Sequence, residues 1–144
     1  MHKPLLALAL LAAPALALAA GEAPARPMVV IDEAATVRDE PPPHGAIGMS
    51  TAYRISDGVP ARTMEFRKRV LHPGAAIGAH VIAHDEVYYV LSGEGEVVSD
   101  GRTARLGPGM AAYLYRGANV GIRQLGAAPL TLIISYPVER IADE

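Results

Sequence analysis

Glycine and proline turns divide the chain into short segments from residue 57 onward, and this spacing constrains the fold more than any other feature. The segments are rich in β-branched and alternating apolar residues, and none holds a sustained helical period. Segments this short favour strands over helices of ordinary length. We therefore predict an all-β protein, with strands at residues 47–55, 62–71, 77–82, 86–91, 94–99, 103–106, 110–115, 120–125 and 130–136.

The turns also indicate how these strands connect. Asp100-Gly101 is the strongest hairpin signal, because both residues tolerate the positive φ angles of a tight two-residue turn. Many short strands at this spacing are typical of a sandwich or a barrel, which protects its strand edges. We also predict a short strand at residues 28–31, followed by an extended connection at the three prolines of residues 41–43.

The amino terminus has the parts of a secretory signal peptide, which we assign to residues 1–19. Lys3 supplies the positive start, residues 5–18 form an apolar run, and the segment ends in Ala-Leu-Ala. The run is shorter than the roughly 20 residues that a bilayer core requires. We expect cleavage, a periplasmic or secreted protein, and no membrane contact after cleavage. The rest divides into an extended arm, residues 20–46, and one β-barrel domain, residues 47–140.

Charge and cysteine content exclude several classes of function. The 144 residues contain 13 Lys and Arg against 15 Asp and Glu, with no large basic cluster, so we expect no nucleic-acid partner. The chain has no cysteine, which excludes disulfides, thiolate metal sites and a cysteine nucleophile. A metal would need nitrogen or oxygen ligands, or methionine sulfur.

Residues 74–93 contain a motif that points to a known family. Gly74, His80, Glu86 and Gly93 follow one another at the spacing of the first cupin motif, and a Leu-Gly-Pro-Gly turn at residues 106–109 approximates the second. With both motifs in order and in an all-β frame, the chain resembles the cupin superfamily. The resemblance implies a double-stranded β-helix, or jelly-roll barrel, with a ligand pocket at one end.

The resemblance covers residues 64–136 and shows where this chain departs from the family. In metal-binding cupins, two histidines and a glutamate of the first motif and a histidine of the second hold the ion. His80 and Glu86 match two of these ligands, but Ile82 and Val120 stand at the other two positions. Divalent metals need three or four protein donors, so we expect no tightly bound cofactor and at most a weak divalent-metal site.

Strand alternation predicts which side chains line the pocket. Alternate residues of a strand share a face, so His80 and Ile82 point the same way. Aliphatic walls with a few polar groups are typical of a small-molecule site. The predicted pocket residues are His80, Ile82, Glu86, Tyr88, Val120, Ile122 and Gln124.

Several roles for the histidines stay open. His80 and Glu86 either form an acid–base pair or satisfy each other as structure. His84 either completes a weak metal site with His80 and Glu86 or lies solvated in a turn. His44 either caps the pocket from the arm or belongs to a linker.

The only basic run leaves another choice. Lys68 shares a strand face with Met64 and Phe66, whereas Arg67 and Arg69 take the opposite face. If the apolar face points inward, Lys68 becomes a contact for an anionic ligand. A bulge or an edge position would instead let it reach solvent.

Two functions fit this pattern. We favour an exported single-domain cupin that binds a small organic ligand without a tightly held metal. The alternative is a metal-dependent cupin enzyme, an oxygenase, isomerase or lyase, that uses His80 and Glu86 with His84, His44 or water as further ligands. Outward tyrosines at residues 113–115, together with the habit of the family, indicate a homodimer.

Overall fold

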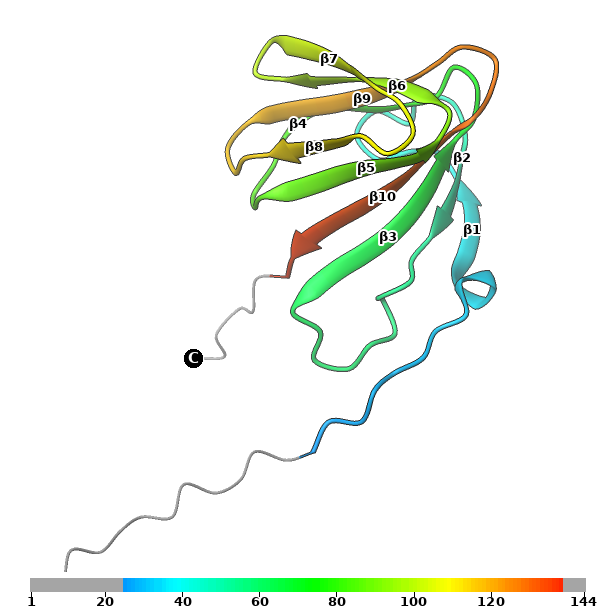
Figure 1. Ribbon diagram of the computed structural model, residues 1–144, viewed down its shortest axis with the longest axis vertical. Helices are drawn as coiled ribbons and strands as arrows, with labels where there is room; N and C mark the ends of the chain where they lie inside the picture. The colour runs from blue at the N-terminus through cyan, green and yellow to red at the C-terminus, as the bar shows by residue number, and fades with distance from the viewer. Residues whose placement is uncertain (1–24, 139–144) are drawn as a thin grey trace, which may run out of the picture.

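The computed structural model describes residues 25–138, and its strands form two antiparallel sheets (Figure 1). The larger sheet has the order β1-β2-β3-β10-β5-β8 and the smaller has the order β4-β9-β6-β7. This confirms the all-β, jelly-roll prediction. The elements are η1 (Glu33–Thr36), β1 (Val37–Glu40), β2 (Ser50–Tyr53), β3 (Met64–Leu71), β4 (Ala76–Val81), β5 (Glu86–Ser92), β6 (Glu94–Ser99), β7 (Arg102–Leu106), β8 (Ala111–Leu114), β9 (Asn119–Leu125) and β10 (Leu130–Pro137).

Each strand predicted between residues 47 and 136 forms within a few residues of its expected bounds. The strand predicted at residues 28–31 does not form, and Met28 and Val30 there are 88% and 85% exposed. An apolar run without a partner strand has no ladder to join. The predicted signal peptide lies outside the described residues. Among the described residues, no helix has the length and apolarity needed to cross a bilayer.

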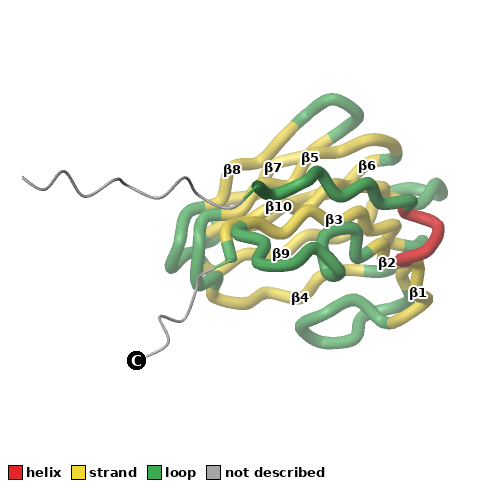
Figure 2. Tube along the Cα trace, turned by 90° about the horizontal axis from the view of Figure 1, so that it is seen from below, coloured by secondary structure: helices red, strands yellow, loops and turns green. Residues whose placement is uncertain are grey.

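The segment assigned to the arm contributes β1, which pairs with β2 at the edge of the larger sheet. Its sequence, Val-Arg-Asp-Glu, has no apolar alternation, so its pairing comes from the backbone and from polar contacts. The Thr51 hydroxyl donates a hydrogen bond to Asp39 at 2.8 Å, and Arg54 pairs with Glu40 at 2.9 Å. Figure 2 shows η1 beside these two strands.

The hairpin prediction at Asp100-Gly101 is confirmed. The two residues connect β6 to β7 with φ angles of 47° and 78°, as a tight two-residue turn requires. The apolar core lies between the sheets and contains the most deeply buried side chains of both. Its members are Leu71, Ala75, Ile77, Ile82, Tyr88, Val90, Val97, Leu106, Leu114, Ala118, Val120, Ile122, Leu130, Leu132 and Ile134.

A bulge in β4 orients the strand for the site. Ile77 is opposite Ile122 on β9, but His80 is opposite Val120, so β4 holds one extra residue in this interval. Gly78 lies within the bulge, and a Cβ atom there would fall 1.7 Å from the His44 carbonyl oxygen. The absent side chain therefore lets the arm pack directly against β4.

Candidate ligand-binding site

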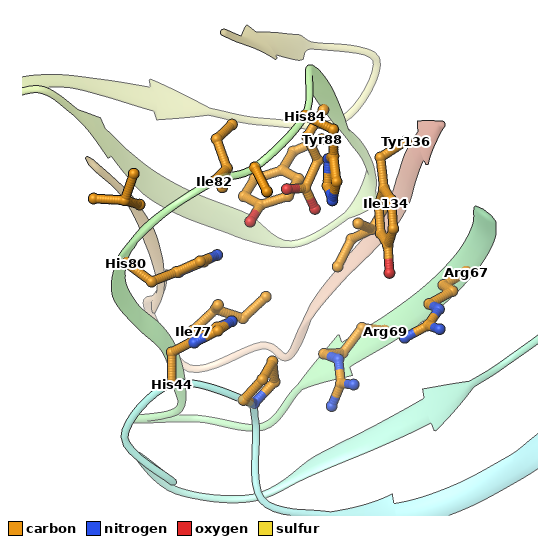
Figure 3. Close-up of a pocket in the computed structure, with 14 residues that line it drawn as sticks. His44, Arg67, Arg69, Ile77, His80, Ile82, His84, Tyr88, Ile134 and Tyr136 are labelled. Carbon is orange, nitrogen blue, oxygen red and sulfur yellow. The ribbon is translucent and has the colours of Figure 1, made fainter. Parts of the chain in front are cut away.

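A cavity of about 310 Å³ opens at one end of the barrel (Figure 3). Its walls come from β3, β4, β5, β10, the turn after β4 and the end of the arm. This volume suits a small organic molecule. The lining residues are Pro43, His44, Arg67, Arg69, Ile77, His80, Val81, Ile82, Ala83, His84, Glu86, Tyr88, Ile134 and Tyr136.

His80 projects from the bulged strand into this cavity (Figure 3). Its Nδ1 atom lies 2.9 Å from the carbonyl oxygen of Gly78, and a carbonyl only accepts, so Nδ1 carries the proton. Nε2 is therefore the acceptor of the neutral ring. The imidazole of His44 stacks on His80 with ring centroids 3.5 Å apart and an angle of 8° between the planes. His44 thus takes the capping position that the sequence left open.

The stack affects the protonation of His44. Burial disfavours its charged form, and the neighbouring His80 adds repulsion, so both lower the pKa of His44. A neutral ring stacks on His80 without electrostatic cost. The end of the arm is thereby attached to β4 by ring contact as well as by the close approach at Gly78.

Glu86 and Tyr88 extend from the inner face of β5 and are 7% and 1% exposed. Neither side chain makes a hydrogen bond to any residue in the described part of the chain. Burial raises the pKa of Glu86 to about 7, while the Arg67 charge acts in the opposite direction. Burial also raises the pKa of Tyr88, and the nearby Glu86 adds to that effect. The cavity therefore holds a carboxyl group that titrates near neutrality beside a neutral phenol.

Arg67 and Arg69 occupy the cavity wall formed by β3, a position that the pocket prediction missed (Figure 3). Arg69 is 6% exposed; its Nη1 donates to the Ser50 hydroxyl at 2.7 Å and its Nη2 to Glu40 at 3.2 Å. Arg67 donates from Nε to Glu65 at 3.3 Å and from Nη2 to Asp57 at 3.2 Å.

The orientation of β3 decides between the two alternatives left open for Lys68: its face points away from the cavity, and β3 is an inner strand without a bulge in its pairing with β10. Met64 and Phe66 are exposed, and Lys68 pairs with Glu33 while its Nζ lies 3.9 Å from the centroid of the Tyr53 ring. Lys68 does not line the cavity. Periodicity alone suggested that the apolar face points inward. The arginine face points inward instead, where Arg67 pairs with Glu65 and Asp57 and Arg69 pairs with Glu40.

His84 and Tyr136 form a second aromatic stack in the cavity wall. Their ring centroids are 4.2 Å apart, with 4° between the planes, and the Arg67 guanidinium lies 5.8 Å from the Tyr136 centroid. His84 Nδ1 approaches the carbonyl oxygen of Asp85 at 3.3 Å. Tyr136 shares its strand face with Ile134, a pattern visible in the sequence, but the sequence does not show which end of β10 borders the cavity.

The predicted pocket set divides into two groups. His80, Ile82, Glu86 and Tyr88 line the cavity together. The three residues predicted on β9 lie elsewhere, because their side chains fill the core or support a loop. These are Val120, Ile122 and Gln124.

Gln124 has a structural role that its residue type did not reveal. Its Oε1 accepts from the Gly74 amide at 2.9 Å, and its Nε2 donates to three carbonyls, at the end of β9 and in the β9–β10 loop, at 2.7 to 2.8 Å. A buried amide with this many partners is already satisfied. It is therefore not available to a ligand.

The side chains present do not fit the metal centre that the family resemblance implies. Within residues 25–138, no three His, Asp or Glu side chains are arranged to hold an ion. His80 and Glu86 form neither a hydrogen bond nor an ion pair with each other, so the paired arrangement considered from the sequence is not formed. Ile82 lines the wall where the family has a histidine.

Two sheets enclosing a core, with a cavity at one end, define the class of jelly-roll proteins with a small-molecule pocket. Residues 68–136 match the family model Cupin_2, which describes a cupin domain. The chain therefore contains a cupin domain over residues 68–136, as its motif indicated. No curated protein matches the chain.

Solved structures share this fold. A predicted oxalate decarboxylase from Thermotoga maritima aligns with a TM-score of 0.68 at 20% identity, covering 77% of this chain and 100% of that one. The polyketide cyclase RemF from Streptomyces resistomycificus aligns with a TM-score of 0.65 at 23% identity, covering 79% and 82%. A protein from Thermus thermophilus aligns with a TM-score of 0.53 at 29% identity, covering 72% and 84%. The first two likenesses are too distant to indicate more than the fold.

Proposed function

We propose that this protein is an exported cupin that binds a small organic ligand in the barrel cavity without a tightly held metal. One observation carries the proposal: Glu86 and Tyr88 are almost fully buried at the cavity and have no hydrogen-bond partner in the described part of the chain. Among the described residues, Arg54 Nε is the one buried side-chain polar atom without a partner, so the polar atoms of Glu86 and Tyr88 remain accessible from the cavity. A ligand can therefore bond to both groups in place of water, while Ile77, Ile82 and Ile134 supply apolar contacts.

The donor chemistry favours an organic ligand over a metal. A metal enzyme would have to use His80 and Glu86 with His84, His44 or water, and the aliphatic side chain of Ile82 supports the metal-free assignment. Export is supported by the signal-like sequence of residues 1–19. Homodimer formation is supported by exposed Tyr113 and Tyr115.

Metal retention separates the two functions. The purified protein is incubated in turn with iron, manganese, nickel, copper and zinc salts, dialysed, and analysed for bound metal. We expect no stoichiometric retention in the parent. Retention of one ion per chain that disappears in His80→Ala would contradict the metal-free proposal.

Ligand binding is tested by thermal shift against a library of small organic acids, amides, alcohols and phenols. A ligand that binds only the folded state raises its melting temperature. We expect hits whose shift falls in Tyr88→Phe, which removes one hydroxyl from the cavity. The control is Tyr89→Phe, because Tyr89 is 40% exposed and does not line the cavity. A library without hits, or equal loss in both variants, would contradict the proposal.

A further inference from the structure

Two guanidinium groups lie side by side on the β3 wall of the cavity, across from Ile82 (Figure 3). Arg67 uses Nε and Nη2 on protein acceptors, and Arg69 uses Nη1 and Nη2. Arg67 Nη1 and Arg69 Nε therefore have no acceptor within residues 25–138. Arginine side chains with unused N–H groups beside a cavity are suited to oxygen anions.

The ion-pair network around these arginines has more cations than anions. Its charged groups are linked by contacts of 2.7 to 3.9 Å and lie behind the β3 wall. Among the described residues, the network joins four guanidinium groups to three carboxylates, a surplus of one positive charge. The cations are Arg54, Arg62, Arg67 and Arg69, and the anions are Glu40, Asp57 and Glu65.

The remaining acid of the cavity neutralises this surplus only in part. Glu86 forms no ion pair with Arg67 or Arg69; burial raises its pKa to about 7, while the Arg67 charge acts in the opposite direction, so the carboxyl is only partly ionised at neutral pH. A protonated Glu86 can donate a hydrogen bond to an anion, as can the Tyr88 hydroxyl. The arginines of the network that line the cavity, Arg67 and Arg69, therefore face the same space as the hydrogen-bond donors of Glu86 and Tyr88.

We infer that the ligand is a small organic monocarboxylate, whose carboxylate group lies beside Arg67 and Arg69 and whose apolar body contacts Ile82 and Ile134. This inference rests on the proposed ligand-binding function and names its ligand class. A single negative charge matches the surplus of one positive charge, and a planar carboxylate matches the geometry of a guanidinium group. The volume of about 310 Å³ limits the ligand to a small molecule.

Matched acid and amide pairs test the inference, because the two members differ in charge and hardly in shape. Benzoate with benzamide and cinnamate with cinnamamide serve as probes, measured by isothermal titration calorimetry and ligand-observed NMR. We expect an acid to bind at least tenfold more tightly than its amide. The affinity of the acid should fall with rising salt, as for any partly exposed charge interaction.

Arg67→Gln should weaken acid binding about tenfold and leave the amide unaffected, while Arg67→Lys should retain part of the preference. We use Arg67 because it is less buried than Arg69, which also supports Glu40 and Ser50. Arg123→Gln is the control, since Arg123 lies on β9 with its side chain 60% exposed.

The outcomes separate this inference from the function on which it rests. Equal or tighter binding of the amides would overturn the carboxylate inference and leave ligand binding intact. If library members that lack a carboxylate bind and no carboxylate binds, the carboxylate inference is likewise overturned and the ligand-binding function remains. A protein that binds neither the pairs nor any library member would overturn both.

Discussion

Replacing Glu86 by glutamine is expected to stabilise the folded protein at neutral and alkaline pH. Glu86 is 7% exposed, makes no hydrogen bond within the described part of the chain, and has its pKa raised by burial to about 7 from an ordinary 4.5. A pKa difference of this size corresponds to about 3 kcal/mol, since one pKa unit is worth about 1.4 kcal/mol. The glutamine side chain of the variant has a similar volume and no charge.

The sign follows from proton linkage. Well below pH 4.5 the carboxyl is protonated in both states and contributes nothing. Between pH 4.5 and about 7 the folded state keeps the proton that the unfolded state releases, so the free energy of unfolding falls as pH rises. Well above pH 7 the full loss of about 3 kcal/mol is present. Glutamine escapes this loss at every pH.

Urea unfolding of parent and variant at pH 4.5 and pH 8 measures the effect. The chain has six tyrosines and no tryptophan, so far-ultraviolet circular dichroism and tyrosine fluorescence are suitable signals. Other titrating groups cancel in the difference between the two proteins. We expect Glu86→Gln to gain about 3 kcal/mol more at pH 8 than at pH 4.5. Glu94→Gln, at an exposed position of β6, serves as the control.

A gain that is the same at both pH values would refute this reasoning, because it would show that ionisation of Glu86 is not the source. A loss of stability at pH 8 would refute it more strongly. That result would mean that the attraction of Arg67 for the ionised carboxylate outweighs the cost of its burial, in contradiction to the raised pKa of Glu86.

Two further substitutions test how the site is supported. Gly78→Ala should displace the arm and destabilise the protein by about 1–3 kcal/mol, because the new Cβ would meet the His44 carbonyl oxygen at 1.7 Å. Urea unfolding measures this loss. An equal loss in Gly58→Ala, where nothing lies within 4 Å of the added Cβ, would contradict the prediction. Gln124→Ala should cost about 1–3 kcal/mol by removing the hydrogen bonds that this buried amide makes to the backbone, yet leave ligand affinity unchanged. Reduced affinity in calorimetry would return Gln124 to the cavity.

Local patterns predicted the strands well. Alternation on β5 correctly assigned Glu86 and Tyr88 to one inner face, and the Asp100-Gly101 turn correctly joined β6 to β7. Both results depend on neighbours in sequence, because side-chain direction in a strand and the φ angles of a tight turn are set locally. The edge strand Val37–Glu40 had no such pattern, since its pairing depends on β2.

Local sequence patterns could not predict which of the inward-facing side chains line the cavity. Val120 shares the inward direction of its neighbour His80, yet it is fully buried in the core and does not line the cavity. Side-chain direction indicates the face of a strand but not the depth along the barrel at which packing stops. The stack of His44 on His80 likewise joins segments far apart in the chain.

The sequence by itself determined the all-β class, the cupin motif and the pairing of Glu86 with Tyr88 on one face. Only the tertiary structure decided that Arg67 and Arg69 face the cavity. Two guanidinium groups can occupy this inner face only where carboxylates lie close enough to pair with them, and folding brings Asp57 to Arg67 and Glu40 to Arg69.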